Sequence, residues 1–334
     1  MQSSGNLSGD FSGGLTDIEG IKVGHFTDSR RPTGCTVVLC ENGAVAGVDA
    51  RGGAPGTAQT DILDPMNTAQ QIHGLALAGG SAFGLEAGAG VVRYLRERGL
   101  GFAIGPLKVP IVPAAVLFDL ALGDPKIYPT AESGYQACVA ATSGKIPEGN
   151  VGAGAGCAVG KLFGPELEMK SGIGTASIAV GKTGLVVAAL MAVNAVGDVH
   201  DFRTGKILVG ARSPDGKGFL NSMEIILSGG YVLSQATTSN TTIGVVATNA
   251  RLSKAEITKV AQMAHDGLAR TINPVHTQFD GDTIFGLATG TLKLKISAGT
   301  VGMIAAAATA QAVIRGVTEA EGIPGLPSYR DLPR

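Results

Sequence analysis

At 334 residues, the chain has room for one large α/β unit or two smaller domains, and it can bury a substantial core. Hydrophobic residues make up 44% and charged residues 16%, and the 51 glycines follow no fixed period, which indicates many tight turns and close backbone approaches. The formal net charge is −1 without a Lys/Arg-rich run, so neither nucleic acid nor an anionic membrane has electrostatic support as a partner.

The cysteines and the first residues bear on the compartment. Four cysteines lack CxxC spacing, which predicts buried thiols in a reducing compartment: Cys35, Cys40, Cys138 and Cys157. The polar, glycine-rich start MQSSGNLSGDFSGG has no basic region followed by an apolar one, so we predict a flexible segment over 1–14, no signal peptide and a cytoplasmic protein. The apolar stretches TGLVVAALMAVNAV and VGMIAAAATAQAVI are too short and Ala-rich for a membrane span.

The first hundred residues read as strands followed by a helix. Short β-branched runs at 35–39 and 44–50 predict successive strands of a buried sheet. The turn-rich segment 51–65 is typical of a structured loop. A helix is predicted within 78–99, because Leu85, Ala89, Val92 and Leu95 recur at helical spacing and Gly99 can cap the end.

Strands and helices continue to alternate beyond the middle of the chain. The run 184–193 predicts a strand, 210–222 a loop, and 223–233 partial order. Ser253 and Glu256 form a capping box, with Ser253 at the N-cap, and open an amphipathic helix.

The last hundred residues complete the predicted fold. The run 283–289 predicts a further strand, and the small residues of 297–317 a closely packed helix. Since strands and helices are mixed throughout, the sequence predicts one layered α/β domain over 15–334.

The segment TTSNTTIGVVATNA (237–250) carries the chemistry. A threonine hydroxyl needs a base to attack an amide, and the α-amine of an N-terminal threonine supplies one, with a pKa of roughly 7.7–8.0. Such a residue arises when the hydroxyl attacks the preceding carbonyl and the chain is cut there. Asn240-Thr241, at the start of an apolar run, suits such a cut. Two other interpretations stay open: an ordinary turn, and a glycosylation acceptor, which lacks a secretory signal.

The chain resembles the family of self-processing aminopeptidases and amidases. That family includes L-aminopeptidase/D-amidase-esterases, β-peptidyl aminopeptidases and endo-type nylon-oligomer (6-aminohexanoate-oligomer) hydrolases. The matching segments follow the family's order: LTDIEGIKVGHFTD, TGCTVVL, GVDARGGAPGT, LAGGSAFGLEAGAGV, NTTIGVVATNARL and HTQFDGDTIF. The resemblance implies an αββα sandwich of the N-terminal-nucleophile-hydrolase type. It also implies self-cleavage into 1–240 and 241–334, with Thr241 as the nucleophile.

The resemblance assigns roles to two further residues. Asn194, in MAVNAVGD, matches the residue whose amide helps to hold the oxyanion; as a residue alone, it also suits a satisfied turn. Lys161, in GAGAGCAVGKLFG, falls where the nylon-hydrolase branch has an active-site lysine. It would keep the threonine amine neutral by charge repulsion, whereas the plain alternative is a solvated surface lysine.

Two carboxylates and one departure favour the nylon-hydrolase branch. Asp280 and Asp282 match its Asp-Gly-Asp, where the aminopeptidases have Ser-Gly-Glu; they would orient the threonine amine, with repulsion keeping one partly protonated. An Asp-Gly turn is the structural alternative. Phe118 occupies the place of an aminopeptidase tyrosine near the substrate, and it cannot donate a hydrogen bond. The aminopeptidases use a serine nucleophile, so the threonine of this chain also favours the nylon-hydrolase branch.

The glycine-rich segment GGSAFGLEAGAG resembles a phosphate cradle, but it lacks the Walker lysine and the strict GxGxxG spacing. We interpret it as tight packing and, through Gly80 and Ser81, as a wall of the substrate cleft. The five histidines are dispersed without an HExxH motif, so neither a metal nor another cofactor is expected.

These observations predict a self-processing N-terminal-threonine amide hydrolase that acts on small oligoamides or short peptides. The alternatives are an aminopeptidase of the same family (for L-amino acids, D-amino-acid amides or β-peptides), an acyltransferase resembling ornithine acetyltransferase, and an uncleaved non-enzymatic scaffold. The resemblance also implies a homo-oligomer, a tetramer or larger.

Overall fold

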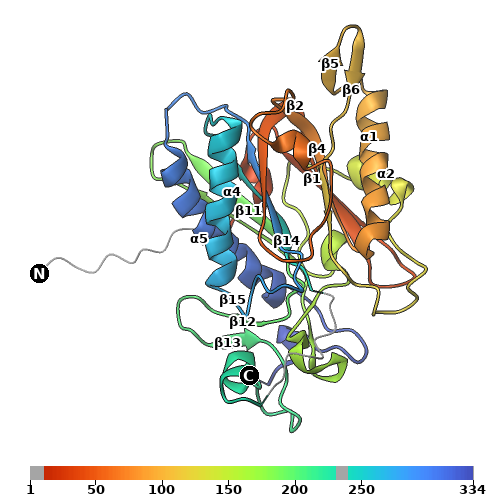
Figure 1. The fold of residues 1–334 in the computed structure, drawn as a ribbon, viewed down its shortest axis with the longest axis vertical. Helices are drawn as coiled ribbons and strands as arrows, with labels where there is room; N and C mark the ends of the chain where they lie inside the picture. Colours follow the sequence, from red (N-terminus) through yellow and green to blue (C-terminus); the bar gives the residue numbers. More distant parts are fainter. Residues whose placement is uncertain (1–10, 231–239, 334) are drawn as a thin grey trace, which may run out of the picture.

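A computed structural model describes residues 11–230 and 240–333 (Figure 1). The first ten residues of the predicted flexible segment 1–14 therefore lie outside the described residues, as do 231–239. Nine strands form the central sheet: β1 (Lys22–Thr27), β2 (Gly34–Ala50), β3 (Gly56–Ala58), β4 (Ile72–Ala78), β7 (Ala114–Val116), β10 (Ile173–Ala179), β11 (Val186–Ala192), β14 (Ile243–Thr248) and β16 (Thr283–Ala288).

The α-helices are α1 (Ala87–Glu97), α2 (Ala131–Val139), α3 (Ser222–Leu227), α4 (Lys254–Ala269) and α5 (Ala298–Thr318). Short strands form three small sheets: β5 (Phe102–Ile104) with β6 (Leu107–Val109), β8 (Ala158–Val159) with β9 (Met169–Lys170), and β12 (Asp198–His200) between β13 (Ile207–Val209) and β15 (Ile272–Asn273). The loop predicted over 210–222 lies between β13 and α3, except that its last residue, Ser222, begins the helix. α3 supplies the partial order predicted over 223–233, of which 231–233 lie outside the described residues.

One long strand joins the two halves of the central sheet. The strand order is β10-β11-β14-β16-β2-β4-β7-β3, with β1 beside β2. β2 runs through both halves, and its pairing with β4 shifts register between Leu39 and Ala44. The two strands predicted at 35–39 and 44–50 are therefore one strand. Gly43, in the left-handed region at φ +85°, allows the irregularity that made them look separate.

The two halves of the sheet pack face to face and are covered by helices, which confirms the predicted αββα architecture. Alternate residues of β11 point to opposite faces: Leu190 lies in the core between the half-sheets, and Met191 lies in the core beneath α4 and α5. In the other half-sheet, Leu77 of β4 faces the central core and Ala78 faces α1 and α2. Figure 1 shows the two helix pairs on opposite sides of the strands.

Small residues bring α5 close to the sheet. A Cβ at Gly174 would lie 2.2 Å from the backbone oxygen of Ala312 and 2.2 Å from the backbone nitrogen of Gly316, so only glycine fits this crossing. α5 has the length and hydropathy of a membrane span, but 61% of its most apolar window is buried in the fold. The helix predicted at 297–317 is thus a core helix of this fold.

The four cysteines are buried and unpaired, as predicted.

Local backbone chemistry sets where the other two predicted helices begin. The helix predicted within 78–99 begins as a 3₁₀ turn at Ser81–Glu86 and becomes α1 only at Ala87, because Gly80 and Ser81 have φ of +82° and +53°. The predicted capping box is confirmed: Glu256 N donates to Ser253 Oγ at 3.4 Å, and Ser253 N donates to the Glu256 carboxylate at 2.8 Å.

Four strand ends meet at one edge of the sheet. β14 and β16 are parallel and start there, with Ile243 opposite Thr283. β11 and β2 run antiparallel to them, so both end at that edge, at Ala192 and Ala50. Segments that are far apart in the sequence therefore come together beside the start of β14.

Candidate active site

Thr241 lies at this edge, two residues before β14, and is 6% exposed. Its backbone N–H donates to the backbone oxygen of Asn194 at 2.8 Å, and its hydroxyl Oγ1 donates to the carbonyl oxygen of Asn240. The hydroxyl is therefore held beside the peptide bond that precedes it. The N–H that would become the α-amine already has an acceptor.

The Asn240 carbonyl oxygen also accepts a hydrogen bond from the backbone N–H of Gly281 at 3.0 Å. A Cβ at Gly281 would lie 2.8 Å from Thr241 Oγ1 and 2.7 Å from the Ala54 backbone oxygen, so glycine is required for this approach. The sequence flagged this residue only as part of an Asp-Gly turn. Its N–H is a donor aimed at the carbonyl that Thr241 would attack.

Asn194 follows β11 and is fully buried. Its Oδ1 accepts from Lys161 Nζ at 2.5 Å and from Ala158 N at 3.1 Å, while Nδ2 donates to the Phe118 backbone oxygen at 3.0 Å. These partners fix which way the amide points. In this continuous chain, the side-chain amide bonds to Phe118, and the backbone oxygen of Asn194 holds Thr241.

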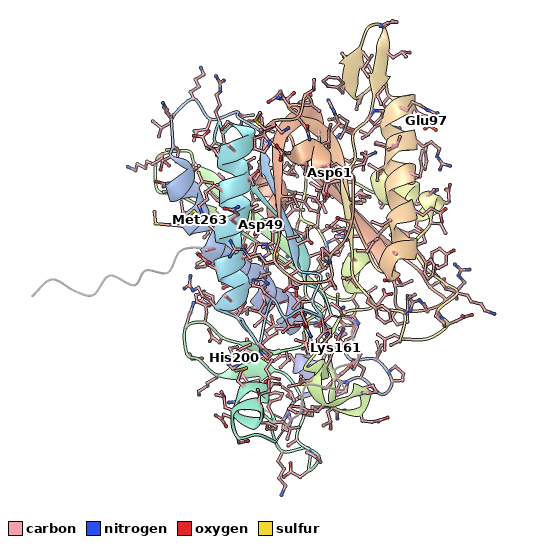
Figure 2. The ribbon with its side chains drawn as sticks, in the orientation of Figure 1. Asp49, Asp61, Glu97, Lys161, His200 and Met263 are labelled. Atoms are coloured by element: carbon pink, nitrogen blue, oxygen red, sulfur yellow. The ribbon has the colours of Figure 1, made fainter. Side chains whose placement is uncertain are left out.

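Lys161 starts a 3₁₀ turn (Lys161–Phe163) after Gly160, whose φ of +71° sets the chain direction. Figure 2 shows Lys161 at the junction between the large sheet and the lobe that contains β12 and β13. Burial lowers the pKa of its ammonium, and the nearby Glu168 and Asp280 carboxylates oppose that shift. Lys161 is therefore a partly buried group of the site, not the solvated surface lysine of the alternative interpretation.

Asp280 and Asp282 precede β16 and are both buried. Asp282 Oδ1 accepts from the backbone N–H of Thr242 at 2.7 Å, and Asp280 Oδ2 accepts from Thr277 N at 2.8 Å and Thr277 Oγ1 at 2.6 Å. Asp282 therefore holds the residue that follows Thr241, and Asp280 holds Thr277 of its own loop. In this continuous chain neither carboxylate is bonded to the Thr241 nitrogen, whose N–H donates to Asn194, so the predicted role of orienting the free amine stays a prediction.

The pair of carboxylates has the electrostatic character that their spacing suggested. Burial first, and then the Asp282 carboxylate, raise the pKa of Asp280 to about 6, with the hydrogen bonds from Thr277 opposing the shift. Asp280 therefore changes charge close to neutral pH, and it directly precedes Gly281, whose N–H binds the Asn240 carbonyl oxygen.

The three residues predicted to line the substrate cleft form one cluster. Ser81 N donates to the Leu117 backbone oxygen at 2.9 Å, which ties Ser81 to the residue before Phe118. Gly80 N donates to Asp119 Oδ1 at 2.9 Å. Asp119 is itself paired with Arg31, and both side chains are fully buried. This ion pair was not found from the sequence, because nothing in the spacing of the two residues connects them.

Histidine chemistry is the other feature that sequence analysis missed. His276 Nδ1 lies 2.8 Å from Asp282 Oδ2, and the backbone N–H of His276 donates to the same oxygen at 3.2 Å. A histidine six residues before Asp282 was visible in HTQFDGDTIF, but spacing in a loop does not predict contact. Within 11–230 and 240–333, no group of three His, Cys, Asp or Glu side chains is arranged to hold a metal ion.

The family model "Peptidase family S58" matches residues 13–329. An uncharacterized aminopeptidase of Mycobacterium bovis is 42% identical, covering 95% of this chain and 97% of the relative. A 6-aminohexanoate-oligomer endohydrolase of Kocuria sp. is 33% identical, covering 85% of this chain and 77% of the relative.

Two solved structures share the fold. A β-aminopeptidase of Burkholderia sp. has a TM-score of 0.68 at 21% identity, covering 93% of this chain and 87% of that one. The L-aminopeptidase D-Ala-esterase/amidase of Ochrobactrum anthropi, described as a variant of the Ntn-hydrolase fold, has a TM-score of 0.67 at 21% identity, covering 94% and 88%. The family model matches nearly the whole chain, and relatives above 30% identity are hydrolases, which argues against the acyltransferase and scaffold alternatives. The chain belongs to peptidase family S58 and is an amide-bond hydrolase.

Proposed function

We propose that this hydrolase cuts itself between Asn240 and Thr241 and then uses Thr241 as an N-terminal nucleophile. One observation carries the proposal. The Asn240 carbonyl oxygen accepts from Thr241 Oγ1 and, at 3.0 Å, from Gly281 N–H, so the attacking hydroxyl and a donor for the developing oxyanion both lie at the bond to be cut.

In the self-cleavage step, Thr241 Oγ attacks the Asn240 carbonyl carbon and loses its proton. The C–N bond breaks, the Thr241 nitrogen takes up that proton, and Asn240 becomes an ester on Oγ. Water then hydrolyses the ester, which yields the Asn240 carboxylate and a free Thr241 α-amine. The Asn194 backbone oxygen, 2.8 Å from the Thr241 nitrogen, holds this amine in place after the cut.

In substrate hydrolysis, the α-amine takes the proton from Oγ as the hydroxyl attacks the substrate carbonyl. It then gives the proton to the leaving amine, and water releases the acyl group from the ester. The Gly281 N–H and the second N–H of Asn194 Nδ2 stabilise the oxyanion. Lys161, at 2.5 Å from Asn194 Oδ1, keeps the amide turned with Nδ2 away from Lys161.

The substrate proposed is a short oligoamide of ω-amino acids or a short peptide. The oligomer endohydrolase relatives and the Asp280-Gly281-Asp282 segment favour the oligoamide. The aminopeptidase relatives, at higher identity, favour the second candidate, removal of an N-terminal residue from a peptide. Phe118 gives the site no hydroxyl at that position, so a substrate need not accept a hydrogen bond there.

Denaturing electrophoresis and N-terminal sequencing test the self-cleavage. The purified protein should give pieces of 240 and 94 residues, and the smaller should begin at Thr241. A single intact chain with full amidase activity would contradict this mechanism.

A panel of four substrates then separates the candidates: the linear 6-aminohexanoate trimer, an L-peptide, a β-peptide and a D-amino-acid amide. Preference for the trimer, with cleavage at an internal bond of longer oligomers, supports the first candidate. Release of single N-terminal residues from the L-peptide, with an inert trimer, supports the second.

A further inference from the structure

We propose that His276 is a positioning residue for the reaction at Thr241 and that it acts through Asp282. This inference rests on the proposed function, since it concerns how the nucleophile of that mechanism is held. The observation behind it is a buried carboxylate that joins the residue after the nucleophile to a histidine side chain.

Asp282 connects two segments of the site. Its Oδ1 accepts from Thr242 N at 2.7 Å, and its Oδ2 accepts from two nitrogens of His276, Nδ1 at 2.8 Å and the backbone N at 3.2 Å. A carboxylate with donors on both oxygens has little freedom to rotate. The position of Thr242, and with it the orientation of the Thr241 hydroxyl, therefore depends on how firmly His276 holds the far oxygen.

The backbone of His276 is bent to make both contacts. Its φ is +56°, in the left-handed region where side chains other than those of Gly, Asn, Asp and His are uncommon. A strained residue of this kind persists only where its surroundings over-determine it, and such residues cluster at functional sites. Here the bend turns the backbone N–H and Nδ1 toward one oxygen of Asp282.

A second histidine packs against the His276 ring. The His265 ring of α4 lies edge-on to that of His276, with 4.8 Å between centroids, and His265 Nε2 is 3.0 Å from the Asp49 backbone oxygen. Burial lowers the pKa of His265 to about 4, so it is neutral at the pH at which the enzyme would work. Figure 2 shows Asp49 beside α4.

The titratable groups around His276 are mostly acidic. They are Asp280 and Asp282 on its own loop, His265 on α4 and, beyond His265, Asp49 on β2. A hydrogen bond from Nδ1–H favours the ionised form of the carboxylate that receives it. His276 also opposes the rise in the pKa of Asp280, so losing the imidazole should push the acidic limb of the pH–rate profile upward.

Three variants at position 276 separate the effect of the imidazole donor from that of the backbone bend. His276→Gly removes the strain and the donor together, whereas His276→Asn tolerates the left-handed backbone and keeps an amide N–H close to the position of Nδ1. His276→Gln, whose amide reaches toward the position of Nε2, is the matched control for Asn and remains informative if the Gly variant does not fold. His73→Asn, on β4, controls for histidine loss elsewhere.

The readouts are the half-time of self-cleavage after cell-free synthesis, and kcat and KM against pH on the best substrate of the panel. His276→Gly and His276→Gln should lower kcat by about tenfold to a hundredfold, the effect of losing a hydrogen bond to a charged group, with KM little changed and the acidic limb moved upward. His276→Asn should restore most of the rate and the profile.

Two results would overturn the inference: a wild-type rate and pH profile in folded His276→Gly or His276→Gln, or His276→Asn as impaired as His276→Gln. Thr241→Ala keeps this result apart from a failure of the proposed function. If Thr241→Ala stays active, the nucleophile assignment fails whatever His276 does. If Thr241→Ala is inactive while the His276 variants match the wild type, only the role of His276 falls.

Discussion

The two sides of Thr241 differ in how their charged groups are used. On the β11 side, Lys161 and Asn194 are joined side chain to side chain, with Nζ 2.5 Å from Oδ1. On the β16 side, Asp280 and Asp282 bind chiefly the backbone and side-chain donors of the loop and of Thr242. The first side thus carries a side-chain donor that can face a substrate, whereas the carboxylates of the second side hold the chain in position and leave the Gly281 N–H as its donor.

Burial acts on both sides but shifts the pKa values in opposite directions. It lowers the pKa of Lys161 and raises that of Asp280 to about 6. Both shifts favour the neutral form, because a low-dielectric surrounding penalises charge of either sign. An amine formed at Thr241 would therefore lie between a lysine and a carboxylate whose charges are both partly suppressed.

Removing the group between the two sides should have the largest effect. Thr241→Ala deletes the proposed nucleophile, so we expect one intact chain on a denaturing gel and a loss of amidase activity of about 10⁶-fold, to the detection limit. Thr241→Ser, which keeps the hydroxyl, is the control and should still cut itself. Cleavage in the Ala variant would show that another residue, or a protease, makes the cut.

The β11 side should show the next largest effect. Asn194→Ala removes an oxyanion donor and should lower kcat by about 10²–10³-fold. Lys161→Met should lower kcat by a smaller factor, because it acts through Asn194. The double variant should be little worse than Asn194→Ala alone, since both changes break one hydrogen-bonded unit. Losses that multiply in the double variant would instead give Lys161 a separate role.

On the β16 side, the free energy of unfolding and the activity should both depend on pH. Between pH 3.8 and about 6, Asp280 stays protonated in the folded chain but ionises in the unfolded chain, so the folded state binds more protons. The free energy of unfolding should therefore fall as pH rises through this window, by at most about 1.4 kcal/mol per pH unit. Activity that needs the ionised carboxylate should rise over the same window.

Denaturant titrations and kcat at several pH values measure both trends. In the wild-type protein, the free energy of unfolding should fall and kcat should rise as the pH increases from 3.8 to about 6. In Asp280→Asn, the part of the stability slope that comes from this residue should disappear. An unchanged slope in the Asn variant would assign the titration to another group.

A change far from both sides should have the smallest effect. Ser253→Ala removes the N-cap of α4 and should cost about 1 kcal/mol in the free energy of unfolding, with kcat unchanged. This variant shows how much a modest loss of stability alone alters the rate. A clear fall in kcat would mean that the position of α4, and with it His265, controls the site.

Much of the site could be predicted because its residues lie at strand ends in recognisable segments. Thr241 precedes the apolar run that becomes β14, Asn194 follows the run that becomes β11, and Asp280 and Asp282 precede β16. The hydrogen-bond partners of these residues could not be predicted from the sequence. Asp282 holds the amide of Thr242, and Asn194 holds the Thr241 N–H through its backbone oxygen, which no side-chain motif can display.

The sequence by itself determined several strands, the capped helix α4 and the family, and it singled out Asn240-Thr241 as the proposed cleavage site, because these depend on local periodicity and on contiguous segments. Only the tertiary structure decided that β14 and β16 start at one edge and that Gly281 N–H points at the Asn240 carbonyl. It alone brought His276 to Asp282 and Arg31 to Asp119. The physical reason is that hydrogen bonds between distant segments depend on strand order and register, which residue types and spacing do not specify.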